Sequence, residues 1–325
     1  MQPQKTSNSG TSQLPFSTAG SDVLPKRKQS PGHRMFCMAI SHDGKILAVS
    51  GEDGRIFTWS SSASIMSSWS VACPSSVEKM LFAPGNDLLL AFSDEGAIHA
   101  WNLGEKLPAK QVTNAHGKGI YAACFGDDDD AELFTGGIDG WIRGWDPFTL
   151  NLVREIKSPK HGVLALLPFK ENGSSILVSG NVNGTIAMFS IDEWELVHSM
   201  PAHDGPVFCL EPVSNEFFIS SGNDDFMRLW QIGNDKPLLE IQAGQGKVLG
   251  ALVLETQGAG EDSHVVLTAG GDGTIASWNL DLASLVFNQV ASIKAHERTV
   301  EQLVHDPARG VFYSLSSDGH VMRWG

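Results

Sequence analysis

A turn acid followed six residues later by an aromatic side chain recurs along this chain and constrains its fold more than any other feature. Five copies pair an aspartate with a tryptophan: Asp53 with Trp59, Asp139 with Trp145, Asp224 with Trp230, Asp272 with Trp278, and Asp318 with Trp324. Two copies keep the spacing with substitutions, Glu95 with Trp101 and Asn183 with Phe189. Seven copies that lie 41 to 48 residues apart predict one repeated structural unit rather than separate domains.

The residues around each copy predict four short strands. In the first unit we expect an innermost strand a at Met35–Ile40, then strands b and c at Lys45–Ser50 and Arg55–Ser60. Asp-Gly pairs between apolar runs favour hairpin turns, because both residues tolerate positive φ. The outermost strand d is more variable, as at Leu152–Lys157 and Pro237–Gln242. The pattern therefore predicts an all-β fold, a seven-bladed β-propeller of four-stranded antiparallel blades.

The two ends of the chain differ from the repeats. Residues 1–21 are rich in Ser, Thr, Gln and Gly and are predicted to form a disordered tail, with the propeller spanning residues 22–325. The last unit ends after its strand c, at Trp324-Gly325. We expect the stretch around Asp22–Ser30 to supply the missing outer strand, so that an N-terminal strand completes the last blade and closes the ring.

The repeat resembles the WD-repeat family over roughly residues 22–325, although it identifies no particular member. In that family a His before strand a, a Ser or Thr on strand b, the turn Asp and the strand c Trp form a hydrogen-bonded cluster. The resemblance implies three complete clusters: His116, Thr135, Asp139 and Trp145; His203, Ser220, Asp224 and Trp230; and His296, Ser314, Asp318 and Trp324.

Other units depart from this pattern. Val49 and Ala91 stand where the first two units should carry the hydroxyl. The fourth unit keeps His161 and Ser179 but has lost the acid and the indole, and the sixth has Thr268 without a matching His. We expect these blades to depend more on apolar packing.

His, Ser and Asp together also invite comparison with a catalytic triad. A triad needs one exposed nucleophile beside an oxyanion hole, whereas recurrence at a fixed register in several units indicates a structural role. The sequence holds no nucleophile elbow, phosphate loop or metalloprotease motif, and its four cysteines form no C-x-x-C pair. We therefore predict a protein that is not an enzyme and uses no cofactor or metal.

Charge and hydropathy limit the classes of partner and the cellular location expected for this chain. A formal net charge of −14 opposes direct binding to nucleic acid or to an anionic membrane. The polar N-terminus lacks the apolar core of a signal peptide, and no apolar run is long enough to span a bilayer. These features predict an intracellular protein, located in the cytoplasm, the nucleus or both.

The loops between blades suggest where partners bind. In the WD-repeat family the d–a and b–c loops share one face, the top. Candidate partner-binding residues in these loops are Arg34, Arg55, Lys118, Trp141, Lys160, Phe226, Lys247 and Arg298. Because the longest acidic run, Asp127–Asp130, falls in an a–b hairpin on the opposite face, we expect a basic top that favours an acidic peptide. Ordinary solvated loop charge remains the alternative, and packing against a neighbouring blade is the alternative for Trp141 and Phe226.

By analogy with the family, the predicted function is a protein–protein interaction scaffold within a hetero-complex. One alternative is a substrate receptor of a cullin ubiquitin ligase, but the Trp-Asp-x-Arg box that some family members use is absent. The single Trp-Asp pair, Trp145-Asp146, is followed by Pro147 and Phe148. A second alternative is a subunit of an RNA-processing, RNA-export or ribosome-associated assembly, which the acidic charge does not exclude.

Overall fold

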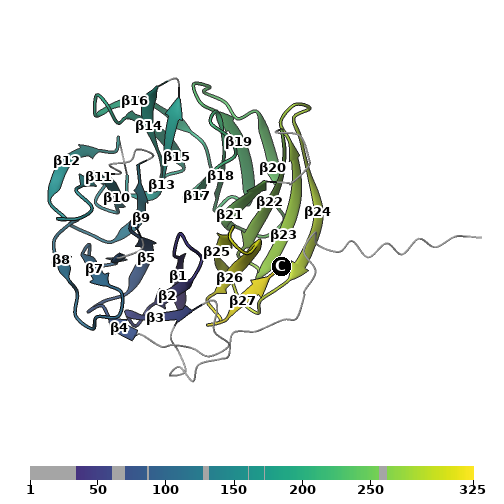
Figure 1. Ribbon diagram of the computed structural model, residues 1–325. Helices are drawn as coiled ribbons and strands as arrows, with labels where there is room; N and C mark the ends of the chain where they lie inside the picture. The colour runs from purple at the N-terminus through teal and green to yellow at the C-terminus, as the bar shows by residue number, and fades with distance from the viewer. Residues whose placement is uncertain are drawn as a thin grey trace, which may run out of the picture.

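The computed structural model describes residues 34–60, 70–85, 88–126, 132–159, 161–171, 173–255 and 262–325. Their strands form seven antiparallel sheets arranged around a central axis (Figure 1). The innermost strands of successive sheets contact one another in chain order, and the innermost strand of the last sheet contacts that of the first. The sheets therefore close into a seven-bladed propeller, as the repeat predicts.

The blades follow chain order, with the innermost strand first in each. Blades 1 to 3 consist of β1 (Met35–Ile40), β2 (Ile46–Gly51), β3 (Arg55–Ser60) and β4 (Ser70–Ala72); β5 (Val77–Phe82), β6 (Leu88–Ser93), β7 (Ile98–Asn102) and β8 (Lys110–Val112); and β9 (Ile120–Phe125), β10 (Leu133–Gly137), β11 (Trp141–Trp145) and β12 (Leu152–Lys157).

Blades 4 to 7 continue the pattern. They consist of β13 (Val163–Glu171), β14 (Ser174–Asn181), β15 (Thr185–Ser190) and β16 (Glu195–Pro201); β17 (Val207–Pro212), β18 (Phe217–Gly222), β19 (Phe226–Gln231) and β20 (Leu239–Gln242); β21 (Val248–Glu255), β22 (Ser263–Gly270), β23 (Thr274–Asp281) and β24 (Val286–Lys294); and β25 (Val300–Asp306), β26 (Val311–Ser316) and β27 (Val321–Trp324).

Blade 7 has three strands among the described residues. The N-terminal strand predicted to complete it, and the predicted tail at 1–21, lie outside the described residues. No helix long and apolar enough to cross a membrane occurs in the part of the chain that the structure describes.

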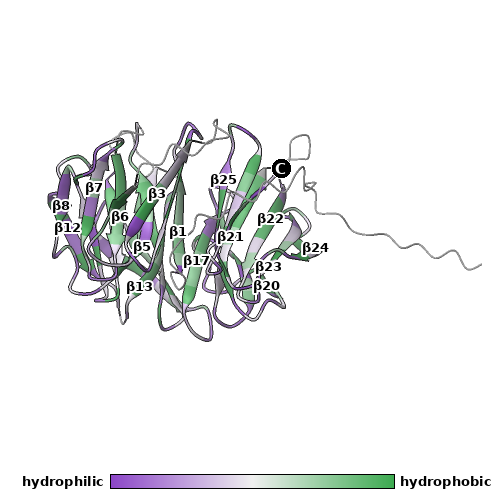
Figure 2. Ribbon diagram, turned by 90° about the horizontal axis from the view of Figure 1, so that it is seen from below, coloured by the Kyte–Doolittle hydropathy of each residue, from purple (hydrophilic) through white to green (hydrophobic). Residues whose placement is uncertain are grey.

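The hydrophobic core is divided into seven clusters, one between each pair of neighbouring blades. The repeated aromatic residue of strand c packs in the cluster between its own blade and the preceding one, as Trp230 does between blades 4 and 5. Strands seen from the side carry stretches of hydrophobic residues between more polar ones (Figure 2). Burial of this surface, at roughly 25 cal/mol per Å², is what holds one blade against the next.

The b–c turns explain why Gly follows the turn acid. Gly184 has φ +83°, and a Cβ there would lie 1.9 Å from the backbone oxygen of His203 in the next d–a loop. A side chain at this position would therefore push the two loops apart. Blade 5 instead places Asp225 in the left-handed region, where its carboxylate accepts hydrogen bonds from the backbone N–H groups of Gly244 and Gln245.

Candidate functional site

The polar cluster of blade 5 joins two strands to the preceding d–a loop. The Nε1–H of Trp230 on β19 donates to Ser220 Oγ on β18 at 2.8 Å, and this hydroxyl lies 2.7 Å from His203 Nε2. His203 Nδ1 lies 2.8 Å from Asp224 Oδ1, and Arg228 donates to the other carboxylate oxygen. Because a carboxylate only accepts, a hydrogen bond between His203 and Asp224 has Nδ1–H as its donor, and Ser220 then donates to Nε2. The Arg228 guanidinium also lies 2.6 Å from Nδ1.

The other two predicted clusters have the same arrangement. In blade 3 the chain runs from Trp145 through Thr135 and His116 to Asp139, with contacts of 2.8, 2.8 and 3.0 Å. In blade 7 Trp324 and His296 both lie within 3.0 Å of Ser314 Oγ, and His296 Nδ1 is 3.3 Å from Asp318. The structure therefore brings together all three predicted sets.

The protonation states follow from burial and these contacts. Burial lowers the pKa of His116 and His203, which favours neutral rings. Although burial alone would raise it, hydrogen bonds from His203 and Arg228 lower the pKa of Asp224 to about 2. The hydroxyls of Thr135, Ser220 and Ser314 belong to residues with 0% exposure and are bonded on both sides. No substrate atom can approach them, so the arrangement suits bracing rather than nucleophilic attack.

Two blades contain substitute residues that the sequence pattern did not reveal. In blade 6 Gln245 takes the place of the missing His: its side-chain oxygen accepts from Thr268 Oγ1 at 2.7 Å, and Trp278 donates to the same hydroxyl. In blade 4 the expectation for His161 is wrong, because its side chain is exposed. Ser158 lies buried instead and donates to Asn181 Oδ1 at 3.1 Å. The available signal was a buried polar residue in the d–a loop that precedes each of these two blades.

Blade 2 shows what happens without the hydroxyl. Ala91 is fully buried, and the Nε1–H of Trp101 is buried without a hydrogen-bond partner among the described residues. His99 stacks on this indole at 5.6 Å between ring centroids. The prediction that such blades depend on apolar packing fits this geometry, because stacking and burial are what remains to hold the ring.

The structure gives the candidate partner-binding residues mixed surroundings. Arg34, Lys118 and Arg298 are exposed, Lys247 is half-buried, and Lys160 lies outside the described residues. Arg55 is 3.7 Å from Asp53 in its own turn. Both aromatic residues pack on cations of their own blades: Arg143 and Lys157 lie near the Trp141 ring, and Arg228 lies near the Phe226 ring. The acidic run at Asp127–Asp130 also lies outside the described residues.

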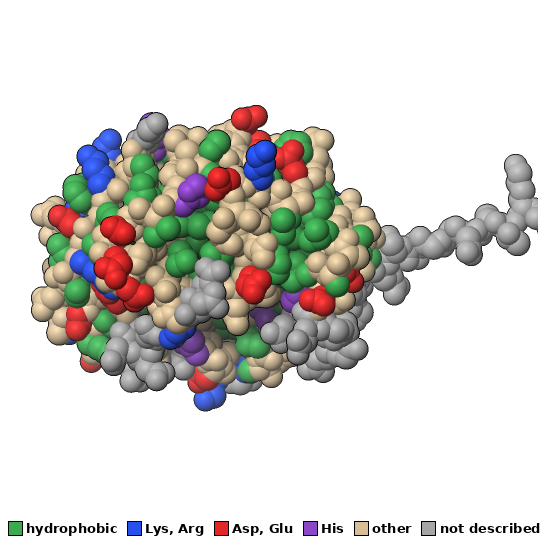
Figure 3. Space-filling model, turned by 90° about the horizontal axis from the view of Figure 1, so that it is seen from above, with side chains coloured by type: hydrophobic (Ala, Val, Ile, Leu, Met, Phe, Trp, Pro, Cys, Tyr) green, Lys and Arg blue, Asp and Glu red, His purple; other side chains and the backbone are tan. Residues whose placement is uncertain are grey.

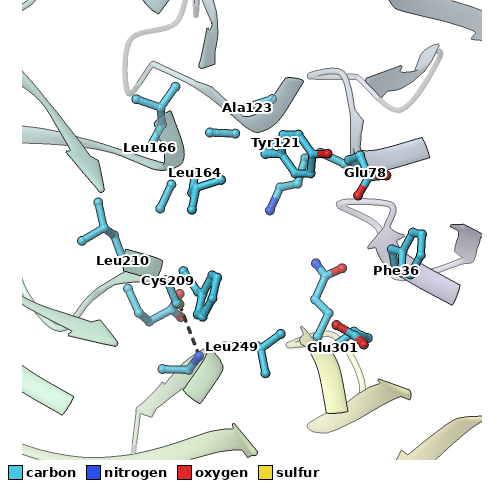
Figure 4. Close-up of a pocket in the computed structure, with 18 of the residues that line it drawn as sticks. Phe36, Glu78, Tyr121, Ala123, Leu164, Leu166, Cys209, Leu210, Leu249 and Glu301 are labelled. Atoms are coloured by element: carbon cyan, nitrogen blue, oxygen red, sulfur yellow. Dashed lines mark hydrogen bonds between the residues drawn. The ribbon is translucent and has the colours of Figure 1, made fainter. Parts of the chain in front are cut away.

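A set of side chains that the sequence pattern missed lines the central channel. In every blade the pairing of strands a and b shifts register at the second residue of strand a, so this residue is a β-bulge. We call these seven residues the channel collar: Phe36, Glu78, Tyr121, Leu164, Phe208, Leu249 and Glu301. All seven line a cavity of about 240 Å³ at the axis (Figure 4).

The collar is asymmetric. Glu301, Phe36, Glu78 and Tyr121 come from the consecutive blades 7, 1, 2 and 3, whereas Leu164, Phe208 and Leu249 come from blades 4, 5 and 6. Burial raises the pKa of Glu78 and Glu301. Deeper in the same cavity, burial raises the pKa of Glu211 to about 7. One half of the collar is therefore acidic and aromatic and the other half is apolar.

Metal binding finds no support in the geometry. Within the described ranges, no group of three or more His, Cys, Asp or Glu side chains is arranged to hold a metal ion. The four cysteines are free thiols, and burial raises the pKa of Cys73 and Cys209 to about 12.

Comparison with known sequences agrees with the repeat. The family described as "WD domain, G-beta repeat" matches residues 25–60, 109–146 and 194–231. The Arabidopsis thaliana protein "Transcriptional corepressor LEUNIG_HOMOLOG" is 22% identical over 292 residues, which are 90% of this chain and 35% of that protein. The Arabidopsis thaliana "U3 snoRNP-associated protein-like EMB2271" is 22% identical over 58% of this chain and 41% of that protein. The chain thus spans between a third and a half of these relatives.

Solved structures agree with the fold. The structure of U3-55K superimposes with a TM-score of 0.81 at 14% identity, covering 95% of this chain and 99% of that one. The crystal structure of the RRP9 WD40 repeats gives the same TM-score at 15% identity, with 95% and 98% coverage. At such identities the likeness establishes a shared propeller architecture.

Proposed function

We propose, from the premise that this chain carries WD repeats in a seven-bladed propeller, that it is a non-catalytic binding subunit of a multiprotein complex inside the cell. The observation that carries the proposal is the saturation of the polar clusters. In blades 3, 5 and 7 each buried hydroxyl is bonded to both an indole and an imidazole, so the groups that resemble catalytic ones are used within the fold. What the molecule offers to others is its loops and its channel.

We place the protein-binding surface on the top face. Lys247, Arg298 and Arg34 come from the loops at three consecutive blade junctions, 5/6, 6/7 and 7/1, and Lys118 lies at junction 2/3. Both Lys247 and Arg34 are close enough to Glu301 to lower its pKa, which places this arc beside the channel collar. An acidic segment of a partner lying along the arc is the finer form of the proposal.

Charge reversal tests this surface. Arg34, Lys118 and Arg298 are changed together to Glu in the full-length chain, and partners are recovered from cells by affinity purification and mass spectrometry. A matched control reverses Lys45, Lys106 and Lys236, which are exposed lysines of the a–b and c–d loops on the opposite face. We expect the top variant to lose partners that the control retains. An unchanged set of partners would exclude the top face.

A subunit role in an RNA-processing assembly is the second candidate. It is favoured by the likeness to the U3 snoRNP-associated protein-like chain and to the two propellers U3-55K and RRP9. The net charge of −14 argues that such a role rests on protein contacts rather than on direct RNA binding. Crosslinking to RNA at increasing salt separates the two, and co-purification of a cullin would instead support the ubiquitin-ligase alternative.

A further inference from the structure

We propose that the channel collar binds the side chain of a lysine or arginine presented by a protein partner. The inference rests on the proposed function, because it assumes a partner on the top face. Such a partner would insert a long cationic side chain into the channel at the axis.

The first argument comes from how the protein treats its buried acids. Asp139, Asp224 and Asp318 in the polar clusters each have a histidine partner within 3.3 Å, and their pKa values are lowered. The carboxylates that line the channel, Glu78, Glu211 and Glu301, differ from these aspartates in both respects. Their pKa values are raised, and no Lys or Arg nitrogen of the described residues lies within ion-pair distance of them. A half-buried carboxylate without a cation is unfavourable, so a cation entering the channel would be stabilised there.

The second argument concerns shape. Glu301 and Glu78 lie on the blades on either side of Phe36. The negative charge of Glu78 raises the pKa of Glu301, so the two carboxylates repel each other. A single positive group between them relieves both carboxylates. Across the channel, Leu164 and Leu249 supply an apolar wall on the other side of the opening (Figure 4). A long side chain with a methylene stem and a cationic end fits both halves of the collar.

Aromatic rings support the same ligand. Phe36 and Tyr121 line the acidic half of the cavity, and aromatic rings attract a cation that lies over their faces. A bare metal ion fits less well. The apolar wall offers it no ligand, and the two carboxylates supply fewer than the six or more oxygens that hard cations prefer.

The charged groups already present do not satisfy this half of the collar. Lys79 lines the same cavity, but the carboxylate whose pKa it lowers is Glu211, below the collar. Lys247 and Arg34 lower the pKa of Glu301 from the rim, yet the pKa remains raised because burial outweighs them. Glu78 receives one hydrogen bond, from Ser76 at 2.7 Å. Glu301 accepts a hydrogen bond from the side chain of Ser317. Neither collar glutamate forms an ion pair with a Lys or Arg of the described residues, so a cation that enters the cavity from outside can pair with them.

The experiment selects ligands without assuming a partner. A displayed library of random peptides is panned against the full-length protein, and the recovered peptides are measured against wild type and Glu78→Gln/Glu301→Gln. Each peptide is also made with its Lys or Arg replaced by norleucine. Glu297→Gln, an exposed glutamate in a d–a loop outside the channel, is the matched control.

We expect recovered peptides to share one Lys or Arg, and norleucine there to weaken binding at least about tenfold. The double glutamine variant should weaken the parent peptide to a similar degree but should not weaken the norleucine peptide further, which is the signature of a direct pair. Glu297→Gln should change nothing. The double variant should unfold at the same or higher urea concentration than wild type, because it removes unpaired carboxylates.

Three results would overturn the inference: peptides with no shared cation, equal binding of the parent peptide to wild type and the double variant, or recovery of no peptide. The proposed function is judged separately. If cellular partners are lost on reversal of the top-face cations but retained by Glu78→Gln/Glu301→Gln, the binding surface stands and the cation site fails.

Discussion

The hydroxyl of Ser220 is the centre of the blade 5 cluster, and its removal gives a measurable loss of stability. Ser220→Ala deletes two hydrogen bonds and leaves Trp230 Nε1–H and His203 Nε2 without partners at 1% and 8% residue exposure. Each buried polar group left unpaired costs about 1–3 kcal/mol. We therefore expect a loss of about 2–6 kcal/mol in the free energy of unfolding, a large share of the roughly 5–15 kcal/mol typical of folded proteins.

The neighbouring serine provides the control. Ser221 is equally buried, but its hydroxyl contacts the carbonyl of Val248, at 3.2 Å, and the Cys209 thiol, so its removal leaves no indole or imidazole without a partner. Ser221→Ala should cost about 1 kcal/mol. Urea unfolding followed by tryptophan fluorescence gives both values, compared at equal m. If Ser220→Ala costs no more than Ser221→Ala, the clusters do not brace the blades.

Blade 2 allows the opposite change. Ala91→Ser places an acceptor beside the unpaired Trp101 Nε1–H, and its own hydroxyl can donate to the carbonyl of His99, the residue opposite it on β7. Ser179 makes the same kind of bond to Ala187 in blade 4. We expect a gain of about 1 kcal/mol in the same assay, and a loss would mean that the site cannot hold the added oxygen.

Three further predictions concern pH and the chain ends. The pKa of Asp224 is about 2 in the folded protein, and those of Asp139 and Asp318 are also lowered. In acid the unfolded chain therefore binds more protons than the folded protein, so the urea midpoint should decrease as the pH is lowered from 5 to 2. Asp224→Asn should make this decrease smaller. Burial raises the pKa of Glu211 to about 7, so its pH dependence of stability is opposite. Its contribution is complete below about pH 4 and is lost as the pH rises through 7. Relative to wild type, Glu211→Gln should gain up to about 3 kcal/mol between pH 5 and pH 8, and a constant difference would contradict burial as the cause. Deleting residues 1–32 should lower the melting temperature markedly while deleting 1–20 should not, and equal melting of both variants and wild type would refute closure of blade 7 by the N-terminal stretch.

The sequence predicted the propeller because its strongest signals are local. A turn acid, a glycine and an aromatic residue at fixed spacing determine one hairpin, and seven hairpins determine the ring. The predicted strands at Met35–Ile40 and Arg55–Ser60 coincide with β1 and β3, while strand b begins one residue later than expected, at Ile46.

The channel collar was harder to predict because a bulge breaks the alternation of inward and outward residues. A regular strand would place Phe36 and Met38 on the same face, whereas the register shift after Met35 turns Phe36 toward the axis. The substitute residues Gln245 and Ser158 were missed for a different reason. The family pattern expects a histidine at this place in the d–a loop, and only the folded loops show that Gln245 and Ser158 make the corresponding contacts.

The collar takes one residue from each blade, and each sits at a bulge, outside the regular ladder between strands a and b. A substitution there alters the lining of the opening while leaving the clusters between blades untouched. Substitutions at the collar can therefore change which ligand the channel prefers without weakening the packing that closes the propeller.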